Sequence, residues 1–285
     1  EGGEAIEPVL KSRLVACGQF EDTQGLRSDS PTIESEGVNI IVSYAACNQL
    51  KLKVADIRNA YFQGEPLDRV LLLAPPRGGL PGEDTHGAAI LARVPIYGTR
   101  DGGRRFWRRL RKIITQAGMK TVAGMKSLYT LQVDGDVKIA MGSHVDDLIW
   151  ACKAEYDHVV QSILDAFEVR KVEQDEFRFC GREYVYQANF DVYVTCRDTP
   201  MNITPITIAR GDRNQDARAH AGEISQLRSV VGSLAWVARQ CRPELSYYVS
   251  CLQSVQTVAK LSHLQDANKL VQVAIDGADD GSHFK

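Results

Sequence analysis

Two adjacent acids in the middle of the chain could carry out metal-assisted chemistry. Asp146 and Asp147 follow a β-like run at 137–141 and precede a second apolar run at 148–151. This layout predicts a β-hairpin with the acid pair at its tip. Neighbouring carboxylates repel each other, and a divalent cation such as Mg²⁺ relieves that repulsion with oxygen ligands. An ordinary Asp-Asp turn in a solvent-exposed loop is the alternative.

A third acid, Asp56, ends another predicted strand, at 51–56. If the two strands are neighbours in one sheet, all three carboxylates meet at one edge of that sheet. Carboxylate oxygens that hold Mg²⁺ or Mn²⁺ can run an in-line phosphoryl transfer. Taken without their surroundings, the acids also fit an unrelated metal-dependent phosphotransferase.

Short motifs around these acids occur in the order typical of one known family. They lie at 11–18, 30–32, 56–64, 75–76, 97–107, 145–147, 179–183, 231–234 and 242–247. Together they resemble the reverse transcriptase of copia-type LTR retrotransposons, in which Val145-Asp146-Asp147 would correspond to Tyr-Val-Asp-Asp. The resemblance implies an RNA-dependent DNA polymerase that uses an RNA or DNA template-primer and deoxynucleoside triphosphates (dNTP).

The resemblance also implies roles for individual residues. The catalytic metal ligands would be Asp56, Asp146 and Asp147, with Mg²⁺ or Mn²⁺ as the cofactor. The nucleotide-binding positions would be Lys11, Arg13, Asn59, Ala60, Tyr61, Arg100 and Asp101. Tyr61 stands where the family has an aromatic ring that excludes a 2′-hydroxyl. Asp101 replaces a Gln, and its charge is expected to repel a triphosphate unless Arg100 or a metal offsets it.

Basic residues crowd positions 93–120, where Asp101 is the one acid, although the whole chain has a net charge of −2. Arginine clusters bind phosphates without sequence preference. Contacts to nucleic acid are therefore expected from this cluster and from the family's primer-holding hairpin, through Arg104, Arg105, Arg108, Arg109, His144, Phe179, Cys180 and Gly181. A solvated helix face, a structural histidine and a buried turn are the alternatives.

Hydrophobic periodicity predicts the elements that would position these residues. Helices are expected at 34–49, 102–116, 155–167, 224–238 and 244–258, and strands at 9–17, 51–56, 69–73, 176–179 and 192–196. In the helix at 102–116, Phe106, Leu110 and Ile113 should face inward. Residues 209–222 are predicted to form a linker.

These elements agree with the α+β right-hand polymerase fold that the resemblance implies. It would have partial fingers, a palm with a small antiparallel sheet packed on helices, and a helical connection region. Residues 1–205 would hold the fingers, the palm and the start of the thumb. Residues 206–285 would form the connection, without an RNase H domain.

Composition narrows the function classes. A hydrophobic content of 44% is enough for a buried core, and no apolar run reaches the length of a membrane span. Seven cysteines without a Cys-x-x-Cys spacing indicate reduced thiols, as expected in the cytoplasm or nucleus. A homodimer or other parts of a polyprotein are the protein partners to consider. The alternative function is a catalytically inactive, host-adopted binding or scaffold subunit, which Asp101 and the short fingers would favour.

Overall fold

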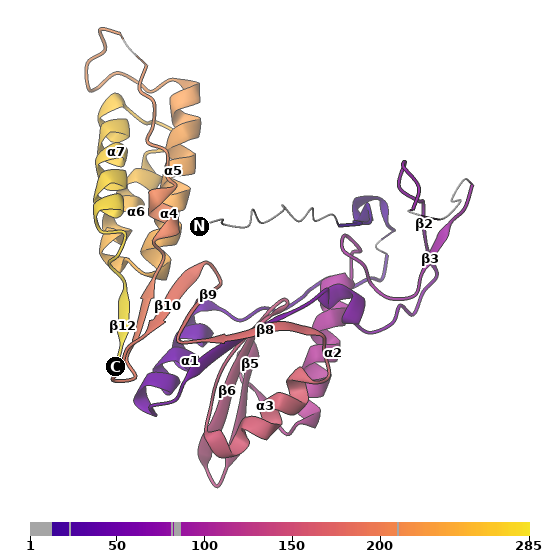
Figure 1. The fold of residues 1–285 in the computed structure, drawn as a ribbon. Helices are drawn as coiled ribbons and strands as arrows, with labels where there is room; N and C mark the ends of the chain where they lie inside the picture. Colours follow the sequence, from indigo (N-terminus) through magenta and orange to yellow (C-terminus); the bar gives the residue numbers. More distant parts are fainter. Residues whose placement is uncertain (1–12, 23, 81, 83–86, 210) are drawn as a thin grey trace, which may run out of the picture. The chain divides into compact units, whose positions relative to one another are not determined.

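The computed structural model describes residues 13–285, apart from 23, 81, 83–86 and 210, so Lys11 lies outside it. It is a mixed α and β structure with antiparallel pairing (Figure 1). Two compact units alternate along the sequence. The first holds the residues up to Glu34, then Ala55–Leu148 and Lys153–Lys171, and the second holds Ser35–Val54, Ile149–Cys152 and Val172–Lys285. These units are defined by contacts within the fold. The boundary expected near residue 205 separates functional regions of a polymerase, and it stays a prediction.

The strands that carry the acids are neighbours in one six-stranded sheet. Its order is β4-β5-β6-β7-β1-β8. The bounds are β1 (Leu52–Ile57), β4 (Lys120–Val122), β5 (Met125–Val133), β6 (Asp136–His144), β7 (Asp147–Cys152) and β8 (Val169–Gln174). The predicted hairpin is thus confirmed, with Val145 and Asp146 between β6 and β7.

Two helices build the core of the first unit. These are α2 (Gly102–Gln116) and α3 (Asp157–Leu164), and the predicted bounds of α2 are confirmed. Phe106 and Leu110 are buried as expected, but Ile113 is half-buried and Ile114 is buried instead, because a spacing of four keeps one helix face inward. The Phe106 ring meets Phe167 edge-on, with centroids 5.8 Å apart.

Shorter elements complete this unit. They are the hairpin of β2 (Leu71–Leu73) and β3 (Ile90–Ala92), and three 3₁₀ turns, η1 (Gly18–Phe20), η2 (Ala60–Gln63) and η3 (Ala154–Tyr156). The strand expected at 9–17 is wrong for its described part, since residues 13–17 form no regular element. Their backbone instead packs on residues 97–98.

That backbone contact needs glycine on both sides. The Ala16 amide donates to the Tyr97 carbonyl at 2.7 Å. Gly98 has φ +89°, and a Cβ there would lie 2.1 Å from the Ala16 carbonyl oxygen. A Cβ on Gly18 would lie 1.9 Å from the Gly98 carbonyl oxygen. Only glycine allows so close an approach, and the contact holds the segment that carries Arg13 against Tyr97.

The second unit combines a four-stranded antiparallel sheet with helices. The sheet order is β12-β11-β10-β9. Its strands are β9 (Glu176–Phe179), β10 (Arg182–Tyr186), β11 (Val192–Thr195) and β12 (Ser282–Phe284). The helices are α1 (Ser35–Cys47), α4 (Asp198–Met201), α5 (Ala221–Gln240), η4 (Pro243–Leu245), α6 (Ser246–Ser254) and α7 (Leu261–Asp276).

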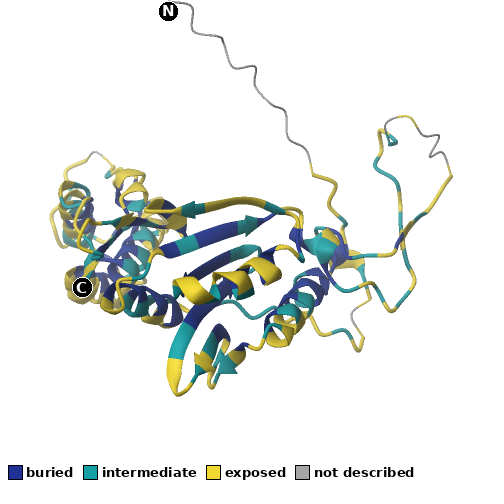
Figure 2. Cartoon of the chain, turned by 60° about the horizontal axis from the view of Figure 1, so that its bottom comes forward, coloured by how far each residue is buried: buried dark blue, intermediate teal, exposed yellow. Residues whose placement is uncertain are grey.

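Helix α5 follows the expected linker and packs with α6 and α7 through buried aliphatic side chains such as Leu234 and Leu264. Figure 2 shows the resulting division of these helices into buried and exposed faces. Among the helices that the structure describes, none is long and apolar enough to cross a membrane.

Replacing Gly98 with alanine tests the glycine contact. Gly98→Ala should lower the free energy of unfolding by more than about 2 kcal/mol, because it adds a backbone collision to the strain of a positive φ. Gly124→Ala is the matched control, since Gly124 has φ +82° and a Cβ there would meet no other atom within 4 Å. Urea denaturation of both variants measures the difference, and equal losses would contradict the contact.

Candidate functional site

The three acids lie at a junction of two neighbouring strands. The Ile57 amide donates to the Asp146 carbonyl oxygen at 2.9 Å, which ties the end of β1 to the β6–β7 turn. Asp56 precedes Ile57, and Asp147 opens β7. All three acids are half-buried.

Each acid of the turn resists ionisation. Burial raises the pKa of Asp147 to about 6, and the charges of Asp146 and Asp56 contribute to that rise. Burial also raises the pKa of Asp146, as does the charge of Asp56, whereas Arg13 and His144 lower it. The three carboxylates therefore act as one repelling group, with basic side chains near it.

The turn itself is strained. Val145 has φ +56°, a left-handed conformation that is an outlier for a β-branched residue. Such a conformation costs about 1–3 kcal/mol and persists where the surrounding structure holds it. The strain sits directly before the acid pair, at the point where the chain must present both carboxylates.

One basic residue pairs directly with an acid of the site. Arg170 on β8 makes an ion pair with Asp56 at 3.0 Å, with side-chain exposures of 55% and 24%. Sequence reasoning did not assign Arg170 to the site. Residues 168–170 resemble an ordinary exposed strand, and only the register of β8 beside β1 shows which acid Arg170 meets.

Tyr61 lies near Asp146 and packs on Tyr97. Burial raises the pKa of Tyr61, and the charges of Asp146 and Tyr97 add to the shift. The Tyr61 and Tyr97 rings are 4.9 Å apart between centroids, and the Arg13 guanidinium lies 5.1 Å from the Tyr97 ring centre. Tyr97 lies in the motif at 97–107, in which nucleotide binding is expected of Arg100 and Asp101 but not of Tyr97, so the structure adds Tyr97 to the site.

Not every expected nucleotide-binding residue faces open space. Asn59 is exposed, with φ +48°, but Ala60 is buried, which leaves its methyl group no surface to offer a ligand. Arg100 donates from Nε to the Gly18 carbonyl at 2.8 Å, and it therefore braces the η1 turn.

Asp101 is held in a buried ion network, which corrects the expectation that its charge opposes a triphosphate. It is 3% exposed and pairs with Arg69 at 2.7 Å and with Arg105. Burial alone would raise the pKa of Asp101, but hydrogen bonds from Arg69 and Arg105 outweigh it and lower the pKa. The charge is thus offset by Arg69 and Arg105, whereas the sequence offered Arg100 or a metal for this role.

The arginines of α2 divide into two groups, contrary to the expectation that all four contact nucleic acid. Arg105 is buried and also pairs with Asp68. Arg109 donates to the carbonyls of Gln63 and Ala166 at 2.6 and 3.1 Å. These two brace the fold, because their guanidinium groups are committed to acids and carbonyl oxygens of the protein.

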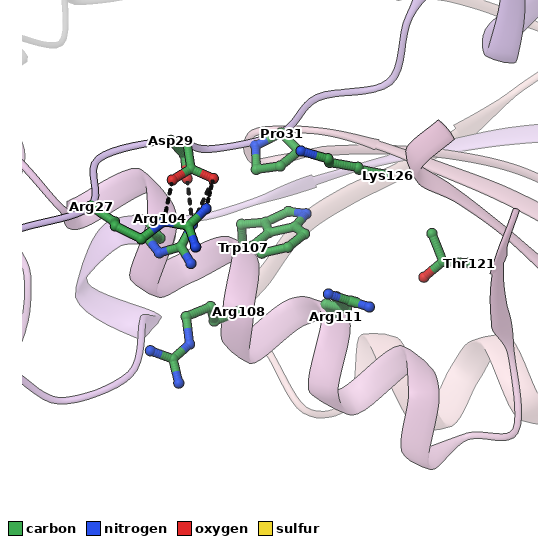
Figure 3. Close-up of a pocket in the computed structure, with 9 residues that line it drawn as sticks. All are labelled: Arg27, Asp29, Pro31, Arg104, Trp107, Arg108, Arg111, Thr121 and Lys126. Atoms are coloured by element: carbon green, nitrogen blue, oxygen red, sulfur yellow. Dashed lines mark hydrogen bonds and ion pairs between the residues drawn. The ribbon is translucent and has the colours of Figure 1, made fainter. Parts of the chain in front are cut away.

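The other arginines of α2 border a basic hollow of about 630 Å³, lined by Arg27, Asp29, Pro31, Arg104, Trp107, Arg108, Arg111, Thr121 and Lys126 (Figure 3). Asp29 pairs with Arg27 and with Arg104, at 3.1 and 2.7 Å. Figure 3 shows Arg108 and Arg111 without such a contact to the other labelled residues. Outside this set, Arg108 pairs with Glu65 at 3.1 Å.

The remaining expected contacts lie on a hairpin of the second unit and beside the acid turn. Cys180 and Gly181 have φ +50° and +75° and form the tight turn between β9 and β10. Phe179 is buried, so its ring packs in the protein core and not on a surface. His144 is half-buried, and its Nδ1 atom has no hydrogen-bond partner.

The acids suit Mg²⁺ by their chemistry but do not form a closed cage. Among the described residues, no group of three or more His, Cys, Asp or Glu side chains is arranged to hold a metal ion. Mg²⁺ does not need such a cage, since it is commonly bound by one or two carboxylates plus waters and substrate phosphates. Burial of Asp147, together with the charges of Asp146 and Asp56 beside it, makes this junction favourable for a cation.

Comparison with known proteins decides the family. The family model described as reverse transcriptase (RNA-dependent DNA polymerase) matches residues 4–192. The chain belongs to the reverse transcriptase family. All three acids and both site tyrosines lie within the matched residues.

Curated relatives place this reverse transcriptase region among the copia-type polyproteins, as its motifs predicted. The retrovirus-related Pol polyprotein from transposon RE2 of Arabidopsis thaliana is 25% identical over 96% of this chain. The corresponding polyprotein from transposon RE1 of the same plant is 24% identical over 92% of the chain. The chain spans only 20% and 19% of these relatives' lengths.

Among solved structures, the foamy viral protease-reverse transcriptase in complex with double-stranded DNA is similar to this chain. The match has 13% identity and a TM-score of 0.48, and it covers 96% of this chain and 39% of the viral one.

Removing the Asp101 charge should destabilise the reverse transcriptase region. Asp101→Asn leaves Arg69 and Arg105 without their shared acid, and breaking a buried pair of this kind costs about 3 kcal/mol. Asp68→Asn is the control, because Asp68 also pairs with Arg105 but its side chain is 76% exposed. Urea denaturation should show a large loss for Asp101→Asn and a small one for Asp68→Asn. A small loss for both would show that the network is not structural.

Removing the Asp147 charge should stabilise the metal-free protein near neutral pH. The pKa of Asp147 is raised from 3.8 to about 6, so the folded chain binds a proton more readily than the unfolded chain. Stability from this group is present below pH 3.8 and is lost as the pH rises through about 6. In EDTA at pH 7.5, Asp147→Asn should therefore raise the free energy of unfolding, by about 1–2 kcal/mol.

The gain should disappear as the pH falls to about 4, where the wild-type carboxyl is largely protonated in the folded state. Asp134→Asn at an exposed turn serves as the control. Thermal denaturation between pH 4 and 7.5 gives the comparison, and a pH-independent effect of Asp147→Asn would argue against a raised pKa of Asp147.

Proposed function

We propose that this chain is the polymerase region of a copia-type polyprotein and catalyses RNA- or DNA-templated DNA synthesis with Mg²⁺ or Mn²⁺. The observation that carries the proposal is the meeting of Asp56 with Asp146 and Asp147 at one strand junction inside the matched region. We further propose that the fold is of the right-hand polymerase type, with fingers and palm within residues 1–205 and a helical connection after them.

Asp56 and Asp146 would hold the metal ion, with Asp147 beside them. Bound there, Mg²⁺ would activate the primer 3′-hydroxyl and neutralise charge on the triphosphate and the departing pyrophosphate. Asp147 is the acid whose charge is most strongly disfavoured, with a pKa of about 6, so it is the residue that gains most from a cation.

The tyrosines would set the position of the sugar. Tyr61 lies near the Asp146 carboxylate and packs on Tyr97, so its ring is held on one side and faces the acids on the other. A rigid ring in that position would leave no room for a 2′-hydroxyl. Arg13, stacked on Tyr97, adds positive charge within reach of Asp146 and of a bound phosphate.

Template-primer binding is assigned to the basic hollow on α2. Arg104, Arg108 and Arg111 border it on one side and Lys126 on the other. The Trp107 indole donates to Ser127 Oγ at 3.3 Å, and Ser127 donates to the Pro31 carbonyl at 2.9 Å, so the wall between these cations is fixed. A rigid cluster of this kind suits the phosphate backbone of a nucleic acid.

The scaffold alternative is not favoured. One of the features that would favour it is the acidic charge at Asp101, and that charge is paired inside the protein with Arg69 and Arg105.

Primer extension with the purified chain tests the proposed activity. Wild-type protein with Mg²⁺, dNTP and an RNA or DNA template-primer should extend the primer, and Asp146→Asn should lower the rate at least about 100-fold, because it removes a metal-binding charge. Asp136→Asn is the control, since Asp136 sits at the opposite end of β6 and is exposed. Full activity in folded Asp146→Asn would exclude this acid from catalysis.

Sugar selection tests the position of Tyr61. Tyr61→Ala should raise ribonucleotide incorporation relative to deoxyribonucleotide incorporation by about tenfold or more, because it opens space beside the sugar. Tyr61→Phe keeps the ring and should keep the selection. The ratio of kcat/KM for the two nucleotides is the readout, and an unchanged ratio in Tyr61→Ala would leave the ring a purely structural role.

A further inference from the structure

The ion pair between Arg170 and Asp56 is set by the register of two neighbouring strands. The Arg58 amide donates to the Glu168 carbonyl at 2.8 Å, and the Arg58 guanidinium pairs with the Glu168 carboxylate at 2.9 Å. Asp56 lies two residues before Arg58, and Arg170 lies two residues after Glu168. One pair leads to the other by moving two residues back along one segment and two residues forward along the other, as expected for antiparallel strands. Side chains two residues apart on a strand lie on the same face, so both ion pairs lie on one face.

The pairs have opposite polarity and differ in their surroundings. The Arg58–Glu168 pair joins two exposed side chains, at 57% and 58%. The Arg170–Asp56 pair joins an exposed cation to an acid that also repels Asp146 and Asp147. Arg170 contacts its acid directly, whereas Arg13 and His144 act on Asp146 through their charge.

The backbone of both strands is fixed beside this pair, whereas the Arg170 side chain is not. The Gln63 amide donates to the Arg58 carbonyl at 2.6 Å, and its oxygen accepts from the Glu168 amide at 2.9 Å. Arg170 is more than half exposed, so its side chain can turn into solvent without moving β8. This separates it from the buried Arg105, which cannot leave its acids.

We propose that Arg170 is a displaceable counter-ion of the acidic site: it occupies Asp56 while no divalent cation is bound and must release it when one binds. The Asp56 carboxylate can then either bind the metal ion or pair with Arg170, but not both at once. An ion pair whose cation is more than half exposed is weak, so a divalent cation can displace Arg170 at a small cost in affinity. This inference rests on the proposed metal-dependent function.

Mn²⁺ binding to the full chain tests the proposal without any activity measurement, with free Mn²⁺ followed by electron paramagnetic resonance. Arg170→Met should bind Mn²⁺ roughly two- to fivefold more tightly than wild type, because the competitor is gone. Arg170→Gln should do the same, and Arg170→Lys, which keeps the charge, should stay near wild type. Glu168→Gln is the matched control, since it breaks the neighbouring pair on the same two strands and leaves Asp56 paired.

The outcomes separate this inference from the proposed function. Tighter binding in Arg170→Met and Arg170→Gln, lost in Asp56→Asn, supports the competition. Unchanged or weaker binding in both Arg170 variants, with wild type binding Mn²⁺, overturns the competition and leaves the metal site intact. Failure of wild type and all variants to bind Mn²⁺ overturns the metal site and the competition together.

Discussion

The partial burial of three neighbouring carboxylates, together with their mutual repulsion, is the constraint on which the rest of the site depends. One backbone hydrogen bond, from Ile57 to Asp146, joins two strand ends, and there burial and the neighbouring acidic charges raise the pKa of Asp146 and of Asp147. Val145 is held in a strained conformation at the same place. A chain that only needed a turn there would favour glycine and uncharged side chains. The unfavourable free energy of the strained turn and of the crowded carboxylates is understandable if a cation bound at this junction offsets it.

The arginines around the site illustrate how one residue type serves two purposes. On α2, Arg105 and Arg109 turn inward, where guanidinium groups satisfy buried acids and carbonyl oxygens. Arg108 and Arg111 are exposed and keep a basic surface, whereas Arg104, with a side chain 17% exposed, pairs with Asp29 at the same hollow. The division follows from helix geometry, since a run of arginines longer than one turn must place some of them on the buried face. The number of basic residues in this part of the sequence therefore overestimates the basic surface that is available to nucleic acid.

Sequence reasoning succeeded where the signal was local. The period of the apolar residues gave the bounds of α2, and the apolar runs on either side of the acid pair gave the β6–β7 hairpin. It failed where partners distant in the chain decide the outcome. Residues 13–17 look like a strand but pack as irregular backbone on Tyr97 and Gly98, and the role of Arg170 depends on a strand register that no local pattern contains. Asp101 was judged by its charge alone, because its partner Arg69 is 32 residues away. Helix α7 was missed because Ala267 and Ala274, which are small, carry part of its buried face.

The central claim is that the junction of Asp56 and Asp146 binds the divalent cation of a nucleotide-transfer reaction. Anomalous X-ray scattering from Mn²⁺ tests it most directly, in crystals of the chain with a template-primer duplex and a dNTP. We predict a Mn²⁺ peak within coordination distance of the Asp56 and Asp146 carboxylates and of the triphosphate. A complex that holds duplex and nucleotide but shows no Mn²⁺ at this junction, or shows it at other residues, would contradict the claim.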